Sequence, residues 1–252
     1  DNAQDVVVSG DYAYVADSSN GLVVVDISDP TNPTGTGAYD PIGYAMGLAV
    51  SGDYAYIAIY NNGLTVVDVS DPTDPTYAGS YDTSGYSYGV AVSGDYAYVA
   101  DYENGLVVVD VSDPANPTRV GGYNTSSYAY GVVVSGDYAY VADGYEGLVV
   151  LDVSDPTDPT MVESYDTSGY ALGVVVSGDY AYVADGTNGL VVVDVSDPTD
   201  PTYAGGYDTS GNAYGVAVSG DYAYVADGSN GGLIVVDVSD PTDPTYAGGY
   251  DT

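Results

Sequence analysis

Aspartate is the residue on which most of the chemistry available to this chain depends. Six aspartates recur at a constant step of 42 residues inside the turn Ser-Gly-Asp-Tyr, namely Asp11, Asp53, Asp95, Asp137, Asp179 and Asp221. Carboxylate oxygens are the ligands that Ca²⁺ prefers, which makes these six the candidate metal ligands. A tight hairpin turn also favours Asp for backbone reasons alone, and none of the Asp-rich loops matches an EF-hand. We therefore expect that no cofactor is required and leave the binding of Ca²⁺ or other cations open.

Tyrosine is the second residue type that could form a site, because the chain contains 31 tyrosines and no Trp, Phe or His. A tyrosine has an apolar face and a polar tip, which suits sugars and extended peptides. The candidate ligand-binding residues form the floor of a shallow basin (Tyr44, Tyr86, Tyr88, Tyr128, Tyr130, Tyr170 and Tyr214) and its rim (Tyr60, Tyr102, Tyr145, Glu103 and Glu146). The alternative is that these tyrosines pack between sheets, because the chain uses Tyr for nearly every large core position.

Catalysis is restricted by the residue types that are missing. The chain has no Lys, His or Cys, and its one basic side chain is Arg119. Acid–base chemistry near neutral pH uses His, Lys, Cys or a strongly shifted carboxylate, and a Ser-His-Asp arrangement needs His. We predict that the protein is not an enzyme, with a glycoside hydrolase using the carboxylates of Glu103 and Glu146 as a remote alternative. One Arg cannot neutralise a run of phosphates, so nucleic acid is excluded as a partner.

The elements that would position these residues repeat with the same step of 42. One period contains an apolar run at 215–218, a Gly-Asp turn and an alternating segment at 222–226. In the preceding repeat an Asn-Gly turn leads into 190–195, Pro residues break that run, and a weaker strand follows at 202–208. Four short strands per repeat of this length indicate a propeller blade. The sequence therefore predicts an all-β, six-bladed β-propeller that forms a single domain over 1–252, with blades near 1–42, 43–84, 85–126, 127–168, 169–210 and 211–252.

The repeats differ on only one of the two faces that this fold would have. The turn between the first and second strands and the loop between the third and fourth strands are nearly identical in every copy, whereas the loops on the opposite face vary. We expect binding residues in those variable loops. We also expect the Asp that ends each third strand to hydrogen-bond the amides of the turn that follows it, and Asp1 and Thr252 to meet where the ring closes.

The segment GLVVVDVSDP at 105–114 and 189–198, and its variant GLVVVDISDP at 21–30, are each followed by two residues and Pro-Thr. This pattern resembles the signature of LVIVD-repeat proteins, and the resemblance covers all six repeats. It implies a β-propeller, often on a bacterial or archaeal cell surface, without a common enzymatic activity. Propellers host many unrelated functions. We therefore predict a non-catalytic scaffold, with a lectin-like or peptide-binding surface module as the alternative.

The net charge of −36 constrains the environment of the protein. Such a charge repels itself in dilute salt, whereas molar salt shortens the screening length to about 3 Å, so a halophilic, extracellular or cell-surface origin fits a natural chain. Five verbatim copies of VSGDYAYVAD indicate recent amplification or an engineered consensus repeat, and we favour the engineered origin. No apolar run approaches the roughly 18–20 residues of a spanning helix, so we expect no membrane insertion. We expect a monomer whose ligand, if it has one, is a carbohydrate or a peptide.

Overall fold

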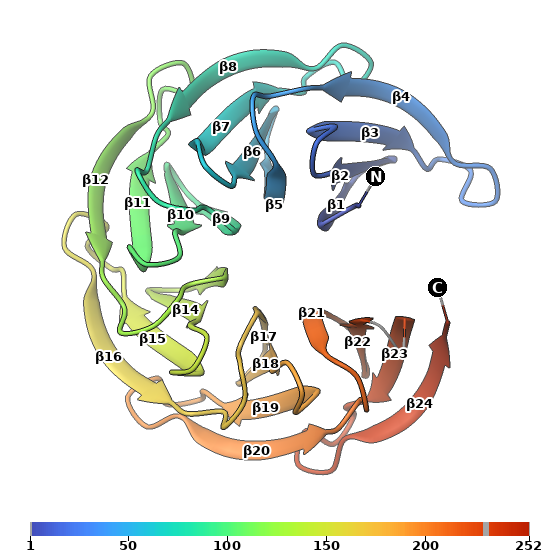
Figure 1. Ribbon diagram of the computed structural model, residues 1–252, viewed down its shortest axis with the longest axis vertical. Coiled ribbons are helices and arrows are strands. Elements are labelled where there is room, and N and C mark those ends of the chain that lie inside the picture. The colour runs from blue at the N-terminus through green and yellow to red at the C-terminus, as the bar shows by residue number, and fades with distance from the viewer. Residues whose placement is uncertain (1, 229–231, 252) are drawn as a thin grey trace. The chain divides into compact units, whose positions relative to one another are not determined.

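The computed structural model describes residues 2–228 and 232–251. The described chain forms six four-stranded antiparallel sheets, each built from strands that are consecutive in sequence, which makes the protein a six-bladed β-propeller (Figure 1). Its residues cluster in two compact units, Asp1–Gly122 and Tyr123–Thr252, and each is described by itself. Asp1 and Thr252, which we expected to meet, lie outside the described residues, and the assignment of a single domain stays a prediction.

The first unit contains three sheets. Their strands are β1 (Asp5–Ser9), β2 (Tyr12–Ala16), β3 (Leu22–Asp26) and β4 (Thr34–Tyr39); β5 (Ala45–Ser51), β6 (Tyr54–Ile59), β7 (Gly63–Asp68) and β8 (Thr76–Tyr81); and β9 (Gly89–Ser93), β10 (Tyr96–Ala100), β11 (Leu106–Asp110) and β12 (Thr118–Tyr123). The first strands of neighbouring sheets contact each other, β1 with β5 and β5 with β9. The boundary with the second unit falls inside β12.

The second unit contains the other three sheets. Their strands are β13 (Gly131–Ser135), β14 (Tyr138–Ala142), β15 (Leu148–Asp152) and β16 (Thr160–Tyr165); β17 (Gly173–Ser177), β18 (Tyr180–Ala184), β19 (Leu190–Asp194) and β20 (Thr202–Tyr207); and β21 (Ala213–Ser219), β22 (Tyr222–Asp227), β23 (Gly232–Asp237) and β24 (Thr245–Tyr250). The four predicted strands correspond to β21, β22, β19 and β20 and are confirmed. Strand β21 starts two residues earlier than predicted because Ala213 pairs with Asp227 across a bulge.

The turn between the first and second strands of each sheet selects glycine through its backbone. The glycine of Ser-Gly-Asp has a φ between 57° and 59° in every repeat, from Gly10 to Gly220. A Cβ added at Gly10 would meet nothing within 4 Å, so the left-handed conformation, and not a shortage of space, excludes other residues. The carbonyl of Asp11 in this turn accepts a hydrogen bond from the Ile27 N–H at 2.8 Å, which fixes the turn to the end of the third strand.

The core of each unit lies between neighbouring sheets. Side chains of the second and third strands of one sheet pack on the next sheet, as Tyr182, Leu190 and Val192 pack with Val225 and Val236. Complete burial of one Leu or Val side chain contributes about 1.5–3 kcal/mol. The alternation of Tyr, Ala and Val along the second strand therefore supplies each sheet with two apolar faces.

The first strands of neighbouring sheets approach so closely that glycine is required at one position of each. A Cβ added at Gly47 would lie 2.9 Å from the Gly89 Cα, which no real side chain tolerates. The first repeat has Asp5 at this position. Its Oδ2 accepts a hydrogen bond from the Leu48 N–H of the next sheet at 2.8 Å, and burial raises the pKa of the Asp5 carboxyl.

The Asp that ends each third strand caps the following turn, as predicted. The Oδ1 atom of Asp26 accepts a hydrogen bond from the Ser28 N–H at 2.9 Å, and Asp194 does the same for Ser196. These hydrogen bonds lower the pKa of both carboxyls. The role of these aspartates is therefore structural.

Candidate functional site

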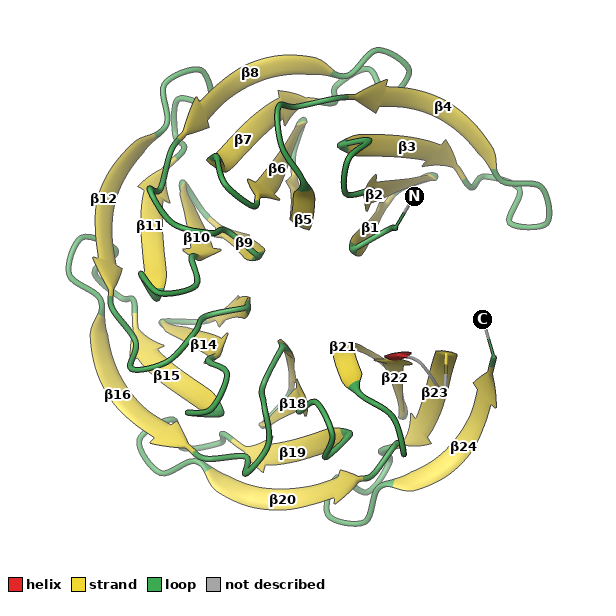
Figure 2. Ribbon diagram, in the orientation of Figure 1, coloured by secondary structure: helices red, strands yellow, loops and turns green. Residues whose placement is uncertain are grey.

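The variable loops are joined to one another within each unit. The loop after the second strand of one sheet pairs with the segment that precedes the first strand of the next sheet, and both are drawn as green loops in Figure 2. In the second unit Gly144 and Ala171 exchange backbone hydrogen bonds of 3.1 and 3.0 Å, and the Ala213 N–H donates to the Gly186 carbonyl at 2.9 Å. These bonds place the two kinds of variable loop on one side of each unit, as predicted.

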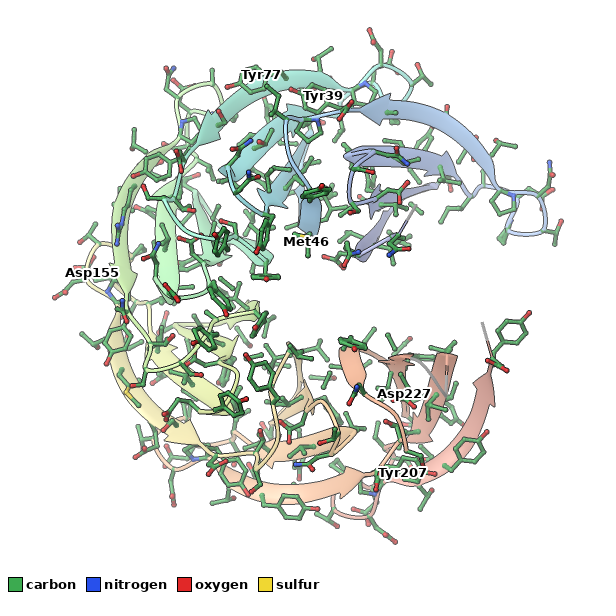
Figure 3. All side chains as sticks on the ribbon, in the orientation of Figure 1. Tyr39, Met46, Tyr77, Asp155, Tyr207 and Asp227 are labelled. Carbon is green, nitrogen blue, oxygen red and sulfur yellow. The ribbon has the colours of Figure 1, made fainter. Side chains whose placement is uncertain are left out.

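A buried Thr–Asp hydrogen bond anchors these loops. The Asp that follows the second strand accepts a hydrogen bond from the hydroxyl of a Thr located 18 residues earlier, at 2.5–2.8 Å; the pairs are Thr83–Asp101, Thr125–Asp143, Thr167–Asp185 and Thr209–Asp227. Figure 3 labels Asp227 at the end of β22. All eight residues are buried. Sequence reasoning missed this pairing, although the constant spacing of 18 residues was visible.

Burial sets the electrostatics of these carboxyls. Loss of hydration raises the pKa of Asp143 and of Asp185, and the hydroxyls of Thr125 and Thr167 partly oppose that rise. Asp185 also accepts a hydrogen bond from the Asn188 side-chain amide at 2.9 Å. Because each carboxylate is spent on loop hydrogen bonds, these aspartates position the loops and are not themselves available to a ligand.

One repeat replaces both members of the pair. Ile59 stands where the other repeats have the buried Asp, and Pro41, 18 residues earlier, stands where they have Thr. Both side chains are buried. A polar pair has thus been exchanged for an apolar pair, which avoids leaving a buried hydroxyl or carboxylate without its partner.

Four of the predicted tyrosines form one cluster in the first unit. The ring of Tyr60 stacks on that of Tyr86 with centroids 4.5 Å apart, and Tyr102 approaches Tyr86 at 6.0 Å and Tyr88 at 5.8 Å. A cleft of about 390 Å³ opens beside them, lined by Asn61, Asp82, Ser84, Gly85, Tyr86, Tyr102, Glu103 and Asn104. This cleft combines aromatic rings with two carboxylates.

The second unit has a larger cleft of about 600 Å³. It is lined by Tyr145, Ser168, Gly169, Tyr170, Leu172, Gly186, Thr187, Asn212 and Tyr214. Tyr145 meets Tyr170 edge to face, with ring centroids 4.5 Å apart and an interplanar angle of 84°. The hydroxyl of Tyr170 is 2.9 Å from that of Tyr130, which fixes the Tyr170 ring from behind. None of the described residues that line this cleft carries a charge.

The remaining predicted binding residues lie apart from these two clusters in their contacts. Tyr44 is exposed, and its carbonyl accepts a hydrogen bond from the Tyr60 N–H. Tyr128 is half-buried. Glu103 lines the cleft of the first unit, whereas Glu146 is an exposed residue of the second unit. The hypothesis of a carboxylate-pair hydrolase therefore stays a prediction.

The six aspartates proposed as metal ligands are all exposed, at the turns between first and second strands: Asp11, Asp53, Asp95, Asp137, Asp179 and Asp221. Over residues 2–228 and 232–251, no three His, Cys, Asp or Glu side chains are grouped so as to hold a metal ion. The backbone reason for Asp in this turn is the one for which the structure gives a contact, through the Asp11 carbonyl.

A third hollow was not expected from the sequence. It measures about 330 Å³ and lies by the outer strands β4 and β8, where Tyr39 and Tyr77 are part of its lining (Figure 3). The register position of Tyr77 is filled by Arg119, Met161 and Tyr203 in the following repeats. In the part of the chain that the structure describes, no helix is long and apolar enough to cross a bilayer.

The repeats match a known family over nearly the whole chain. The model of the LVIVD repeat matches six times, at residues 2–41, 42–83, 84–125, 126–167, 168–209 and 210–252. The chain belongs to the LVIVD-repeat family. The resemblance noted in its third strands is thus confirmed, and the matched segments coincide with the predicted blades to within a few residues. No curated protein matches the chain.

Solved structures share the fold of this LVIVD-repeat protein at low sequence identity. A functionally unknown protein from Desulfotomaculum acetoxidans is 12% identical, with a TM-score of 0.79 over 98% of this chain and 84% of the other. A provisionally named 6-phosphogluconolactonase from Bacteroides uniformis is 15% identical, with a TM-score of 0.78 over 94% and 81%. The computationally designed protein Ika8 is 8% identical, with a TM-score of 0.70 over 94% and 71%. At these identities the likeness concerns the fold alone.

Proposed function

We propose that this LVIVD-repeat propeller is a non-catalytic binding module whose second unit holds a neutral carbohydrate in the cleft at Tyr145, Tyr170 and Tyr214. One observation carries the proposal. Tyr145 is 72% exposed and Tyr214 is 56% exposed, and both border a cleft whose described lining has no charge, in a chain with a net charge of −36. Large exposed aromatic side chains beside a hollow mark interaction sites.

The chemistry of the lining fits a sugar. The apolar C–H face of a pyranose packs on an aromatic ring, and Tyr145 and Tyr170 present two rings at nearly a right angle. Hydroxyl and amide groups that can exchange hydrogen bonds with sugar hydroxyls come from Ser168, Thr187 and Asn212. The glycine at 186 keeps this floor open, because a Cβ there would lie 3.4 Å from the Tyr170 Cβ.

A scaffold without a ligand is the second candidate function. It is favoured by the near identity of the repeats, since a chain assembled from one repeat acquires its loops together with its fold. The two candidates differ in a single measurable property, which is saturable binding at the cleft of the second unit.

The test is a glycan array followed by titration calorimetry with the best neutral glycan. We expect the Tyr145→Ala variant to lose at least about tenfold in affinity, since stacking on one aromatic side chain contributes on the order of 1–3 kcal/mol. Tyr203→Ala, which removes another exposed tyrosine from β20, is the matched control and should bind like the parent. An array without hits supports the scaffold, and a signal for peptides instead of glycans, or one that survives Tyr145→Ala, contradicts the proposal.

A further inference from the structure

We propose that the cleft of the first unit is a separate site for an organic ammonium ion, held against the rings of Tyr86 and Tyr102 and beside the carboxylates of Asp82 and Glu103. This inference does not depend on the carbohydrate site. It concerns another unit of the chain and a ligand of another class.

The four tyrosines of this cluster support one another. Tyr60 covers Tyr86 with an interplanar angle of 10° and meets Tyr88 edge to face at 5.4 Å. Tyr102 stands at 61° to Tyr86, so that the two rings form a corner at the cleft. A cation in such a corner interacts with the electron-rich faces of both rings.

Comparison of the repeats shows how this corner arises. Tyr60 and Tyr102 occupy the second position of the loop after the second strand, where the fourth and fifth repeats have Gly144 and Gly186. Tyr86 is therefore flanked by tyrosine on both sides. Tyr170, its counterpart in the second unit, is flanked by glycines that lie within 3.3–3.4 Å of it when a Cβ is added to them.

The backbone of Tyr102 is strained. Its φ is +49°, in the same left-handed region as Gly144 at +53° and Gly186 at +55°. A bulky residue with positive φ is a rare outlier, and such strain persists mainly at binding and catalytic sites. The loop conformation calls for glycine, so the Tyr102 side chain is retained against the preference of the backbone, and its ring completes the corner.

The charges at the cleft favour a cation over a neutral ligand. Asp82 and Glu103 both line the cleft and are exposed to solvent, and the net charge of −36 concentrates cations around the protein. The cleft of the second unit has the rings but not the carboxylates among its described lining residues. The same scaffold thus presents one acidic and one neutral aromatic cleft.

The test compares choline with its neutral isostere 3,3-dimethylbutan-1-ol, titrated into the full chain at constant ionic strength and followed by tyrosine NMR signals. We expect saturable choline binding that is at least about tenfold tighter than binding of the isostere, because cation–π and carboxylate attraction act on the charged ligand alone. Equal affinity for the two compounds, or no choline binding, overturns the proposal. Choline displaced equally by sodium at matched ionic strength indicates a diffuse counter-ion and overturns it too.

Variants separate the ring from the backbone at residue 102. Tyr102→Gly and Tyr102→Ala should both lose at least about tenfold in choline affinity, whereas Tyr102→Phe, which keeps the ring, should stay within about threefold of the parent. Tyr102→Gly should melt a few degrees above Tyr102→Ala, since glycine relieves the left-handed strain. Glu103→Gln should weaken choline binding and leave the isostere unaffected, and Tyr203→Ala should change neither. Unchanged choline affinity in Tyr102→Gly refutes the site even where every variant folds.

Discussion

The buried hydrogen bond between Thr167 and Asp185 should contribute measurably to stability. Thr167→Val keeps the shape of the side chain and removes the hydroxyl that donates to the Asp185 Oδ1 atom at 2.5 Å. Asp185 keeps the Asn188 amide as a donor but loses one charge-assisted bond in a fully buried place. Hydrogen bonds to charged groups contribute about 1.5–3 kcal/mol. For a chain of this size that loss lowers the melting temperature by about 3–12 °C.

The assay is thermal unfolding by circular dichroism at several pH values. The Thr167 hydroxyl favours the ionised form of Asp185, whose folded-state pKa burial raises. The deficit of Thr167→Val should therefore be complete above that pKa and should shrink as the pH falls through it. The control is Thr157→Val, which removes a similar bond of 2.7 Å to Asp155 in an exposed turn. Equal losses in the two variants, or a deficit that does not change with pH, would refute the reasoning.

Three further predictions concern the same carboxylates. Stability should peak at about pH 4–5: Asp5, Asp143 and Asp185 have a raised folded-state pKa, so their contribution is lost as the pH rises through it, whereas turn residues such as Asp26 have a lowered pKa and lose theirs as the pH falls below about 3.8; calorimetry across pH that shows a plateau up to pH 7 contradicts this. The melting temperature should rise with NaCl because salt screens the net charge of −36, and a flat salt series would remove the inference of a halophilic origin. Ile59→Asp alone should cost about 3 kcal/mol as a buried, unpaired carboxylate, and adding Pro41→Thr should recover part of that loss; a double-mutant cycle with no coupling would show that the two positions are independent.

The fold could be predicted almost completely from the sequence because the repeat supplies each piece of evidence six times. The Ser-Gly-Asp turn needs a left-handed glycine, and its recurrence fixes the period and the hairpin together. The alternation of Tyr, Ala and Val fixes which strands have two buried faces. These signals are local, and for that reason a single sequence reveals them.

The candidate sites could be predicted only as a set of residues. The variable loops and their tyrosines were identified, but the division into an acidic cleft at Tyr86 and a neutral cleft at Tyr170 depends on contacts between residues about 20–40 positions apart. The Thr–Asp pairs were overlooked because loop aspartates were weighed as ligands, although their burial gives them a structural role. The joint replacement by Pro41 and Ile59 was the one signal that could have revealed the pairing.

The two clefts show how a chain of near-identical repeats can acquire distinct sites without altering its fold. Positions that the backbone fixes, such as Gly10 and its equivalents, do not vary. Residue 102 and its equivalents are also constrained by a left-handed backbone, yet they read Ser, Tyr and Gly in different repeats. A position that varies in spite of a backbone constraint is under a different pressure from one that varies because nothing restrains it. Tyr102 belongs to the first kind, and for this reason its ring, more than any exposed tyrosine on the outer strands, marks a place where binding has been favoured over stability.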